Sequence, residues 1–344
     1  MKPARDLPRN RILIGDVRAR VRELPDASVN CIITSPPYFQ LRDYGQADQI
    51  GAEAEVEAWA ASITAVCAEL WRVLTPGGAL WLNLGDGYAR RPSEGTAKKS
   101  LLLGPQRVAL RLTRAGWLLR NVAVWAKKNP MPASVTDRLS TTHEFVYFFT
   151  KQPTYYFDLD AIREPASTPP HGGRSSRSDY PPRRAVPTLG GGISPRVDLN
   201  HGLAALKATG RESHPLGKNP GDVWHVSTAS YRGAHFATFP VELVRRPLLA
   251  TCPERVCVRC GHAWRRADQV VDGRRLAIGP LRAACRCNAG WQPGIALDPF
   301  MGAGTVAIAA ETYGRDWVGI ELNPEYAELA EKRLAQWREK VGVG

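Results

Sequence analysis

A glycine turn near the end of the chain has the composition of a ligand-binding loop. Within Leu-Asp-Pro-Phe-Met-Gly-Ala-Gly-Thr, residues 297–305, Gly302 and Gly304 allow the backbone to approach a bound molecule closely. The helix expected after them begins with N–H groups that have no partner inside the helix. The spacing is not the G-x-G-x-x-G of pyrophosphate-binding loops. Asp298 instead places a carboxylate beside the turn, which suits a ligand with a cationic amine.

A second acidic residue, Glu321, ends the apolar segment that follows the turn, about 20 residues further along the chain. A carboxylate at the tip of such a strand can hold both hydroxyls of a ribose. One carboxylate for an amine and another for a ribose together fit S-adenosylmethionine (SAM). The predicted SAM site consists of Asp298, Phe300, Gly302, Gly304, Thr305 and Glu321.

The segment Thr-Ser-Pro-Pro-Tyr, residues 34–38, is a candidate catalytic turn at the end of another apolar run. Its two prolines, Pro36 and Pro37, fix the backbone and remove two N–H donors, so the turn is rigid and rich in acceptors. Such a turn suits an exocyclic NH₂ group, whose hydrogens the Ser35 hydroxyl and the Pro36 carbonyl could accept. The ring of Tyr38 could stack on a flat base.

TSPPY and DPFMGAG together resemble the motifs of the DNA amino-methyltransferases, which modify the exocyclic amine of cytosine or adenine. The catalytic segment precedes the SAM loop, which is similar to the circularly permuted, beta-group arrangement of that family. The resemblance covers roughly residues 11–160 and 218–340. It implies that Asp16 contacts the cofactor adenine, and that Phe236 and Pro240 line its methionine side.

The resemblance also bears on the substrate and the mechanism. Cytosine-N4 enzymes of the family usually carry Ser at the first position of the tetrapeptide, and adenine-N6 enzymes usually carry Asp or Asn. Ser35 therefore favours cytosine. The resemblance implies that the target base is flipped out of duplex DNA and stacks on Tyr38, while Ser35 and Pro36 hold its amine in line with the methyl group.

Three other functions stay open from the sequence alone. Adenine-N6 methylation keeps the same fold and cofactor. Methylation of RNA or of a protein amide uses related Pro-Pro-Tyr sites. A zinc-containing nucleic-acid-binding protein without activity is an interpretation from a different class, against which TSPPY, DPFMGAG and Glu321 argue.

Five of the seven cysteines lie between residues 252 and 287. Four of them form two pairs with 24 residues between the pairs: Cys257 with Cys260, and Cys285 with Cys287. Two thiolate pairs at this spacing predict a tetrahedral zinc site, with Cys252 and His262 as alternative ligands. Methyl transfer from SAM requires no metal, so the predicted zinc is structural.

Apolar periodicity predicts the elements that position these motifs. Strands are expected at 11–16, 29–38, 79–86, 117–125, 144–151, 295–300 and 317–322, and helices at 53–74, 106–116, 240–250, 302–314 and 324–340. A Pro-Gly-Gly run at 76–78 is expected to stop the first long helix. The alternation predicts an α/β fold, a Rossmann-like, parallel-rich sheet of seven strands with helices on both faces. His143 and Glu144 are interpreted as structural.

The motifs, the composition and what the family resemblance implies together divide the chain into four predicted parts. They are a catalytic half at 11–160, a loop-rich, basic target-recognition insert at 161–235, a SAM-binding half at 236–250 and 291–342, and a cysteine-rich zinc insert at 252–290.

The charge of the 344-residue chain favours a polyanionic partner. It carries 46 Lys and Arg against 33 Asp and Glu, a net charge of +13, and we expect duplex DNA as the partner. Candidate phosphate contacts are Arg174, Arg177, Arg183, Arg184, Arg255, Arg259, Arg265 and Arg266. With no apolar run long enough to span a bilayer and no signal peptide, the chain is expected in the cytoplasm. The resemblance adds a restriction endonuclease as a possible partner.

Overall fold

The computed structural model describes residues 7–42, 45, 49–165, 214, 216–228, 239–271 and 274–342. The chain divides into two compact units, one made of Met1–Ala161 with Gly221–Gly344 and the other of Ile162–Pro220. Among the described residues, no helix is both long and apolar enough to cross a membrane.

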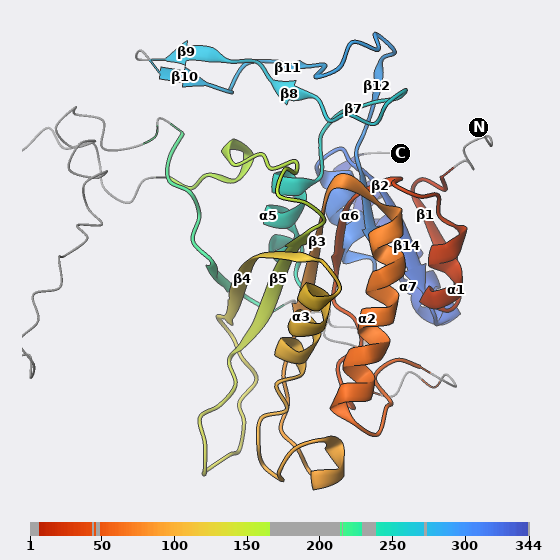
Figure 1. Cartoon of the computed structure of the whole chain (residues 1–344), viewed down its shortest axis with the longest axis vertical. Helices are drawn as coiled ribbons and strands as arrows, with labels where there is room; N and C mark the ends of the chain where they lie inside the picture. The colour runs from red at the N-terminus through yellow and green to blue at the C-terminus, as the bar shows by residue number, and fades with distance from the viewer. Residues whose placement is uncertain are drawn as a thin grey trace, which may run out of the picture. The chain divides into compact units, whose positions relative to one another are not determined.

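A single large sheet forms the centre of the first unit (Figure 1). In spatial order its strands are β1 (Arg11–Ile14), β14 (Asp316–Glu321), β13 (Ile295–Asp298), β2 (Val29–Thr34), β3 (Leu74–Leu84), β5 (His143–Thr150), β4 (Leu118–Lys127) and β6 (Val223–Val226). Every neighbouring pair is parallel except the two pairs that contain β5. The carboxyl ends of β1, β14, β13 and β2 therefore meet at one edge of the sheet.

Among the described residues, the sheet has eight strands, one more than the sequence predicts. The additional strand, β6, lies inside the range predicted as a loop-rich insert, and pairs in parallel with β4. Its side chain Trp224 is buried, and its carbonyl at Val226 accepts a hydrogen bond of 2.9 Å from the Trp125 indole. Four residues give too short a pattern to stand out in a stretch rich in Pro, Gly, Ser and Arg.

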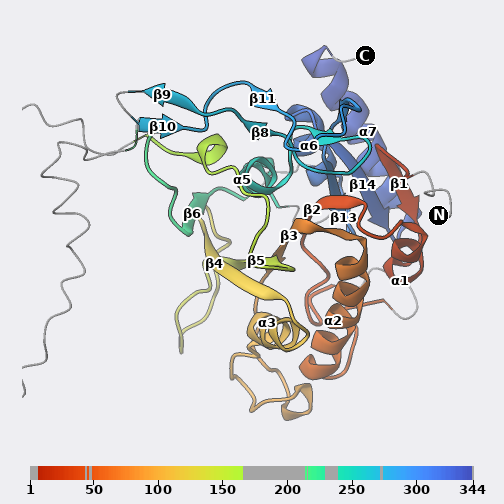
Figure 2. The same ribbon diagram turned by 45° about the horizontal axis from the view of Figure 1, so that its top comes forward.

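Helices cover both faces of the sheet, as Figure 2 shows. The first face carries α1 (Val17–Arg20), η1 (Val21–Glu23), α2 (Val56–Val73) and α3 (Gly104–Arg114), and the second carries α5 (Val241–Thr251), α6 (Thr305–Thr312) and α7 (Pro324–Val341). Strand β2 serves both cores because successive side chains of a strand point to opposite faces. Ile32 joins the first core, while Cys31 and Ile33 join the second. This two-sided burial confirms the predicted α/β class.

The start of β3 differs from the prediction. The long helix α2 ends at Val73 and β3 begins at once at Leu74, five positions before the expected strand. The Pro-Gly-Gly run lies inside the strand and not in a loop. A side chain at Gly78 would collide with Leu74 and with the carbonyl of Asn30, and the register with β2 shifts near this point. The glycine is therefore needed for the close approach of two strands. In the sequence alone, a Pro-Gly-Gly run is typical of a turn.

Between α5 and β13 the chain makes an excursion that we call the cysteine module, residues 252–292. It contains three small antiparallel sheets: β7 (Val256–Cys257) with β12 (Trp291–Gln292), β8 (Arg265–Arg266) with β11 (Leu281–Arg282), and β9 (Gln269–Val271) with β10 (Arg274–Leu276). The module enters β13 at its amino end, Ile295. It therefore joins the sheet at the edge opposite the carboxyl ends of the parallel strands (Figure 1).

Two short helices and a β-bridge lie outside the elements described so far. Two short 3₁₀ helices occupy η2 (Pro92–Glu94) and η3 (Asp160–Ile162). In the second unit Glu164 forms an isolated β-bridge with Lys218. The predicted phosphate contacts Arg174, Arg177, Arg183 and Arg184 lie outside the described residues.

Candidate active site

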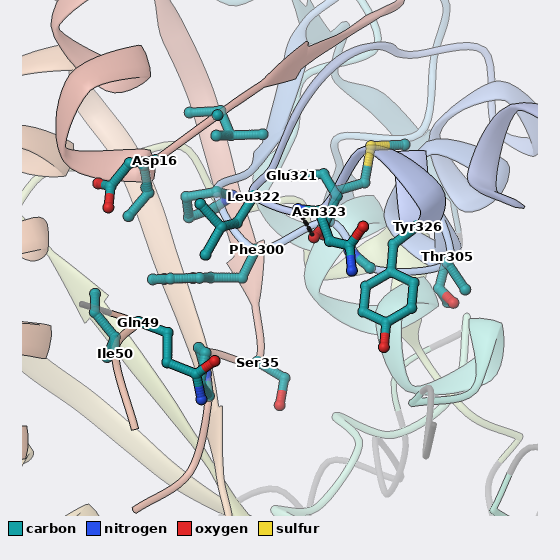
Figure 3. Close-up of a pocket in the computed structure, with 18 of the residues that line it drawn as sticks. Asp16, Ser35, Gln49, Ile50, Phe300, Thr305, Glu321, Leu322, Asn323 and Tyr326 are labelled. Atoms are coloured by element: carbon teal, nitrogen blue, oxygen red, sulfur yellow. Dashed lines mark hydrogen bonds between the residues drawn. The ribbon is translucent and has the colours of Figure 1, made fainter. Parts of the chain in front are cut away.

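A pocket lies at the carboxyl edge of the sheet, where β1, β2, β13 and β14 end side by side (Figure 3). Its wall is built mainly from the segments at these four strand ends, namely Gly15–Val17, Ser35 with Pro37, Pro299–Ala303 and Glu321–Asn323. Side chains from two sequence-distant motifs therefore face one cavity. This is the edge at which open α/β sheets bind ligands.

Most predicted site residues lie in this pocket or directly beside it. Those that line it are Asp16, Ser35, Pro37, Phe300, Gly302, Thr305 and Glu321. Those that are direct chain neighbours of a lining residue are Pro36, Pro240, Asp298 and Gly304. Tyr38 lines a smaller neighbouring pocket, and Phe236 lies outside the described residues.

Several lining residues were missed by the sequence analysis. Asn323 and Tyr326 follow Glu321 at the start of α7, where the Asn323 side chain caps the helix by accepting from the Glu325 N–H at 2.9 Å. The Asn-Pro pair that marks this cap was visible in the sequence. Phe239 lies in the same aromatic segment as the predicted Phe236, and the pattern did not distinguish them. Gln49 and Ile50 come from an aperiodic loop without any signal.

The glycine turn and Glu321 are locked together by backbone hydrogen bonds. Gly302 has φ of +49° and Gly304 has φ of +76°, the left-handed conformation that favours glycine. The Gly302 N–H donates to Glu321 Oε2 at 2.7 Å, and the Asn323 N–H donates to Oε1 at 2.9 Å. Burial raises the pKa of this carboxyl above its usual value. Each carboxylate oxygen has a second acceptor position, so the side chain is oriented and can still bind two hydroxyls.

Asp298 at the end of β13 has one satisfied and one unsatisfied oxygen. Its Oδ1 accepts from the Thr34 hydroxyl at 2.7 Å and from the Phe300 N–H at 3.1 Å. Its Oδ2 is buried and has no hydrogen-bond partner among the described residues. Burial, with the Glu321 charge nearby, raises the pKa of Asp298 to about 7. A cationic group beside Oδ2 would remove the cost of this unpaired oxygen, as the amine of SAM would do.

Asp16 follows β1 and caps α1. Its Oδ1 accepts from the Arg18 N–H at 2.7 Å, and the Arg18 guanidinium donates to both carboxylate oxygens. The hydrogen bonds from Arg18 hold the pKa of this carboxyl below its usual value. Figure 3 shows Asp16 across the pocket from Thr305 and Tyr326, with Phe300 between them. The Asp16 carboxylate is thus ionised, and Arg18 fixes its orientation in the wall of the pocket.

Ser35 begins a chain of hydrogen bonds that runs away from the pocket. Its hydroxyl donates to Tyr38 Oη at 3.1 Å, and Tyr38 donates to Glu144 Oε2 at 2.7 Å. Glu144 is held in turn by Lys127 Nζ at 2.6 Å and by Asn83 Nδ2 at 3.0 Å. The Trp59 indole N–H donates to the Pro37 carbonyl at 2.9 Å and anchors the turn on α2.

The direction of this chain follows from its acidic end. A carboxylate can only accept, so the Tyr38 hydroxyl must donate to Glu144. Burial of the hydroxyl beside this carboxylate raises the pKa of Tyr38 well above its usual value, so Tyr38 keeps its proton. Its oxygen then accepts from Ser35, which leaves the Ser35 oxygen to accept from a ligand. Glu144, interpreted from the sequence as merely structural, thus reaches the predicted catalytic serine through one side chain.

The four predicted zinc ligands also come together, at the opposite edge of the sheet. The sulfur atoms of Cys257, Cys260, Cys285 and Cys287 all lie within 4.8 Å of one another. The alternative ligand Cys252 is buried in the second core. Arg255 packs between Trp264 and Trp291, with 4.1 Å from its guanidinium carbon to the Trp291 ring centre. Arg266 lies near Asp158 and Glu254, so both arginines have partners inside the first unit.

Comparison with known proteins gives the family. Residues 29–332 match the family model N6_N4_Mtase, described as DNA methylase. The Type II methyltransferase M.XycI of Xanthomonas campestris pv. cyanopsidis is 35% identical over 93% of this chain and 86% of its own length. The Type II methyltransferase M.SmaI of Serratia marcescens is 31% identical over 95% of this chain and 91% of its own length.

Two solved structures share the fold. The PvuII DNA methyltransferase (cytosine-N4-specific) superimposes with a TM-score of 0.55 at 15% identity, covering 99% of this chain and 95% of that one. A DNA modification methylase of Thermus thermophilus, described as putative and complexed with SAM, superimposes with a TM-score of 0.52 at 22% identity, covering 95% and 93%. At these identities the likeness concerns the fold.

Proposed function

The chain belongs to the N6_N4_Mtase family of DNA methylases, and on that premise we propose that it methylates the N4 amine of cytosine in duplex DNA. The observation that carries the choice of base is Ser35, which lines the pocket at the first position of the tetrapeptide. Adenine-N6 enzymes of the family usually have Asp or Asn there. The cytosine is flipped out of the duplex to reach this pocket.

The cellular setting is part of the proposal. M.XycI and M.SmaI are named Type II methyltransferases, so we place this chain in a Type II modification system, with a restriction endonuclease of the same specificity as its partner. The reaction then takes place on cellular DNA in the cytoplasm. The net charge of +13 supports a polyanionic substrate.

The residues of the pocket fit SAM. Asp298 offers its buried, unpaired Oδ2 to the cationic amine, and Glu321 offers one acceptor position on each oxygen to the ribose. Among the described residues, and apart from its two chain neighbours, a Cβ at Gly302 would meet no atom within 4 Å, so these residues leave open space in front of the turn. Asp16, at the end of β1, is proposed to contact the adenine. When bound, SAM supplies an electrophilic methyl group.

Ser35 prepares the target amine for this methyl group. The lone pair of an exocyclic amine is delocalised into the ring, so the free amine is a poor nucleophile. Hydrogen bonds accepted by Ser35 Oγ and by the Pro36 carbonyl keep the pair on the nitrogen and orient it. Because the Ser35 hydroxyl donates its hydrogen bond to Tyr38, its oxygen is directed to accept. Catalysis is then mainly orientation and electrostatics.

Glu144 and Lys127 act on this step through Tyr38. Their ion pair, 2.6 Å long, lies at the far end of the chain from Ser35. It fixes the Tyr38 hydroxyl and strengthens the acceptor character of Ser35, since consecutive hydrogen bonds polarise one another. Both are positioning residues that are not proposed to touch the substrate. Zinc has no part in this transfer, so an ion in the cysteine module would serve the fold.

The substitution Ser35→Ala tests the proposal. We expect kcat for methyl transfer to a duplex carrying the recognition sequence to fall by about 100-fold, because one oriented acceptor is lost. SAM affinity, measured by calorimetry, should change less than about twofold. Ser62→Ala on α2 removes a hydroxyl that bonds only within its helix and is the matched control.

Two outcomes would contradict the assigned role. One is a parallel loss of SAM affinity and turnover in Ser35→Ala, which would make Ser35 part of the cofactor site. The other is labelled methyl in RNA or protein but none in duplex DNA, which would overturn the substrate.

A further inference from the structure

The cysteine module holds a cluster that methyl transfer does not use. The sulfur atoms of Cys257, Cys260, Cys285 and Cys287 lie within 4.8 Å of one another, and all four cysteines are free thiols. In a tetrahedral site with Zn–S bonds of about 2.3 Å, neighbouring sulfurs are just under about 4 Å apart, so the cluster has the size of such a site. We infer that these four cysteines bind one zinc ion, which clips the cysteine module into its fold.

The local backbone is arranged for thiolate ligands. The Cys257 N–H donates to the His262 carbonyl at 2.9 Å and the Gly261 N–H donates to the Cys257 carbonyl at 2.9 Å, which closes a tight turn around the first pair. Gly261 takes φ of +69° in that turn. The turn keeps Cys260 beside Cys257, so that both sulfur atoms can reach one ion.

The second pair, Cys285 and Cys287, lies between β11 and β12. Because Cys257 belongs to β7, the cluster joins the strand that opens the module to the segment that closes it. An ion bound there would connect both ends of the excursion.

The described residues of the module form short strands and a small aromatic cluster. Its three sheets contain strands of two or three residues each. Its aromatic contacts centre on Trp264 and Trp291, with ring centres 6.4 Å apart, and on Arg255 between them. Segments of about 40 residues or fewer usually need a metal, a disulfide or a partner to fold. Zinc supplies here the energy that a larger apolar core would supply.

The chemistry of the donors selects the metal. Four thiolates without carboxylate or imidazole prefer zinc or iron over hard cations. A complete set of four protein ligands leaves no open coordination position, which is the mark of a structural zinc site. Cys252 is not part of the cluster. It lies in the second core, and its N–H donates to the Leu248 carbonyl at 2.9 Å. The inference is independent of which base the enzyme methylates.

Metal analysis of the purified full chain, prepared without chelators, tests the inference. We expect about one zinc per chain in the wild type, and a loss of at least about tenfold in zinc content in Cys260→Ser and Cys287→Ser. Cys252→Ala removes a neighbouring thiol outside the cluster and should keep its zinc. Replacement of zinc by Co²⁺ should give the absorption bands of a tetrathiolate site in the wild type and in Cys252→Ala.

Zinc removal should also open the module. After chelation, limited proteolysis should cut within residues 252–292 faster than in the zinc-loaded protein, with SAM binding retained. The inference is overturned if the folded wild type binds no zinc even after incubation with zinc chloride. Iron in place of zinc, a disulfide among the four cysteines, or full zinc content in Cys260→Ser would overturn it as well.

Discussion

At the carboxyl edge of the sheet, Asp298 keeps a buried oxygen without a hydrogen-bond partner among the described residues, and Ser35 donates its hydroxyl hydrogen to Tyr38 and so directs its oxygen into a pocket. At the amino edge, four cysteine sulfurs face one another within 4.8 Å. Both edges concentrate polar groups at strand ends. The polar groups at the carboxyl edge face a pocket that a ligand can enter and leave. The sulfur atoms at the amino edge face one another and leave room for one ion.

The two edges are expected to contribute to the folding free energy with opposite sign. Unpaired buried groups at the carboxyl edge cost folding energy, which a bound ligand would offset. The thiol cluster at the amino edge would itself provide folding energy once it holds an ion. Substitutions at the first edge should therefore act on binding and turnover. Substitutions at the second should act on the fold of one segment.

The largest effect on cofactor binding is expected for Asp298→Asn, which removes the charge proposed to face the SAM amine. Loss of one member of a buried charge pair costs about 2–5 kcal/mol, so SAM affinity should fall by at least about 30-fold. Calorimetry on the folded variant measures this. Asp316→Asn at the amino end of the neighbouring strand is the matched control and should leave SAM affinity unchanged. Equal SAM affinity in wild type and Asp298→Asn would remove Asp298 from the cofactor site.

The pH dependence of SAM binding should be the next largest effect. In the SAM-free protein the pKa of Asp298 is about 7, far above the value of about 4 expected for the unfolded chain. Between these values the folded state holds a proton that the unfolded state lacks, so this residue makes the SAM-free protein less stable as pH rises through that window.

A cationic amine binds the ionised form of Asp298. SAM affinity should therefore increase with pH up to about 7, by at most about tenfold per pH unit, and then level off. Proton release on binding, measured by calorimetry in buffers of different ionisation enthalpy, should be largest below pH 7. An affinity independent of pH, with no proton released, would contradict an interaction of the SAM amine with Asp298.

Glu144→Gln should lower kcat by about tenfold, because it removes the charge that directs the hydrogen-bond chain from Ser35. SAM affinity should stay unchanged. Glu57→Gln, which removes a carboxylate paired with Arg107 and Arg111 on another part of the first unit, is the matched control. A kcat equal to that of the control would show that Glu144 only supports the strand.

Tyr38→Phe should reduce kcat by about three- to tenfold, since the ring stays and only the hydroxyl is lost. The substitution separates two roles for this residue. A side chain that only stacks on the flipped base would tolerate the change, whereas a link between Ser35 and Glu144 would not. Single-turnover rates with saturating SAM and DNA distinguish them, and an unchanged rate would favour stacking alone.

The smallest effect on methyl transfer is expected from the other edge. Cys260→Ser should change kcat by less than about twofold at temperatures where the module is not needed for overall stability. Thermal unfolding of the same variant should begin earlier than in the wild type. A loss of turnover as large as that in Ser35→Ala, without loss of fold, would mean that the two edges are coupled.

The sequence predicted site residues that belong to short motifs, but not contacts between residues far apart in the chain. Ser35, Gly302 and Glu321 belong to short motifs in which neighbouring residues determine the backbone geometry. All three line one pocket in the structure. The bond between Tyr38 and Glu144 joins positions 106 residues apart, which no pattern within either segment reveals.

The same limit applies to the fold. Strand β6 pairs with β4 about a hundred residues away in the chain, and its four residues carry no periodic signal of their own. The helix predicted to stop before the Pro-Gly-Gly run at 76–78 does end there, at Val73. The place of this run inside β3 was missed, because the close approach of Gly78 to Asn30 on a neighbouring strand depends on tertiary pairing. The cysteine pairs were readable because metal-ligand spacing is itself a local pattern.

The central claim is that the Ser35 edge of the sheet methylates the N4 amine of cytosine. The most direct measurement is mass spectrometry of nucleosides from duplex DNA treated with the purified protein and methyl-labelled SAM. The account predicts label in N4-methylcytosine, and about 100-fold less of it when Ser35→Ala replaces the wild type at matched protein concentration and short reaction times. Label in N6-methyladenine would contradict the assignment of the base to Ser35 while leaving the cofactor site intact.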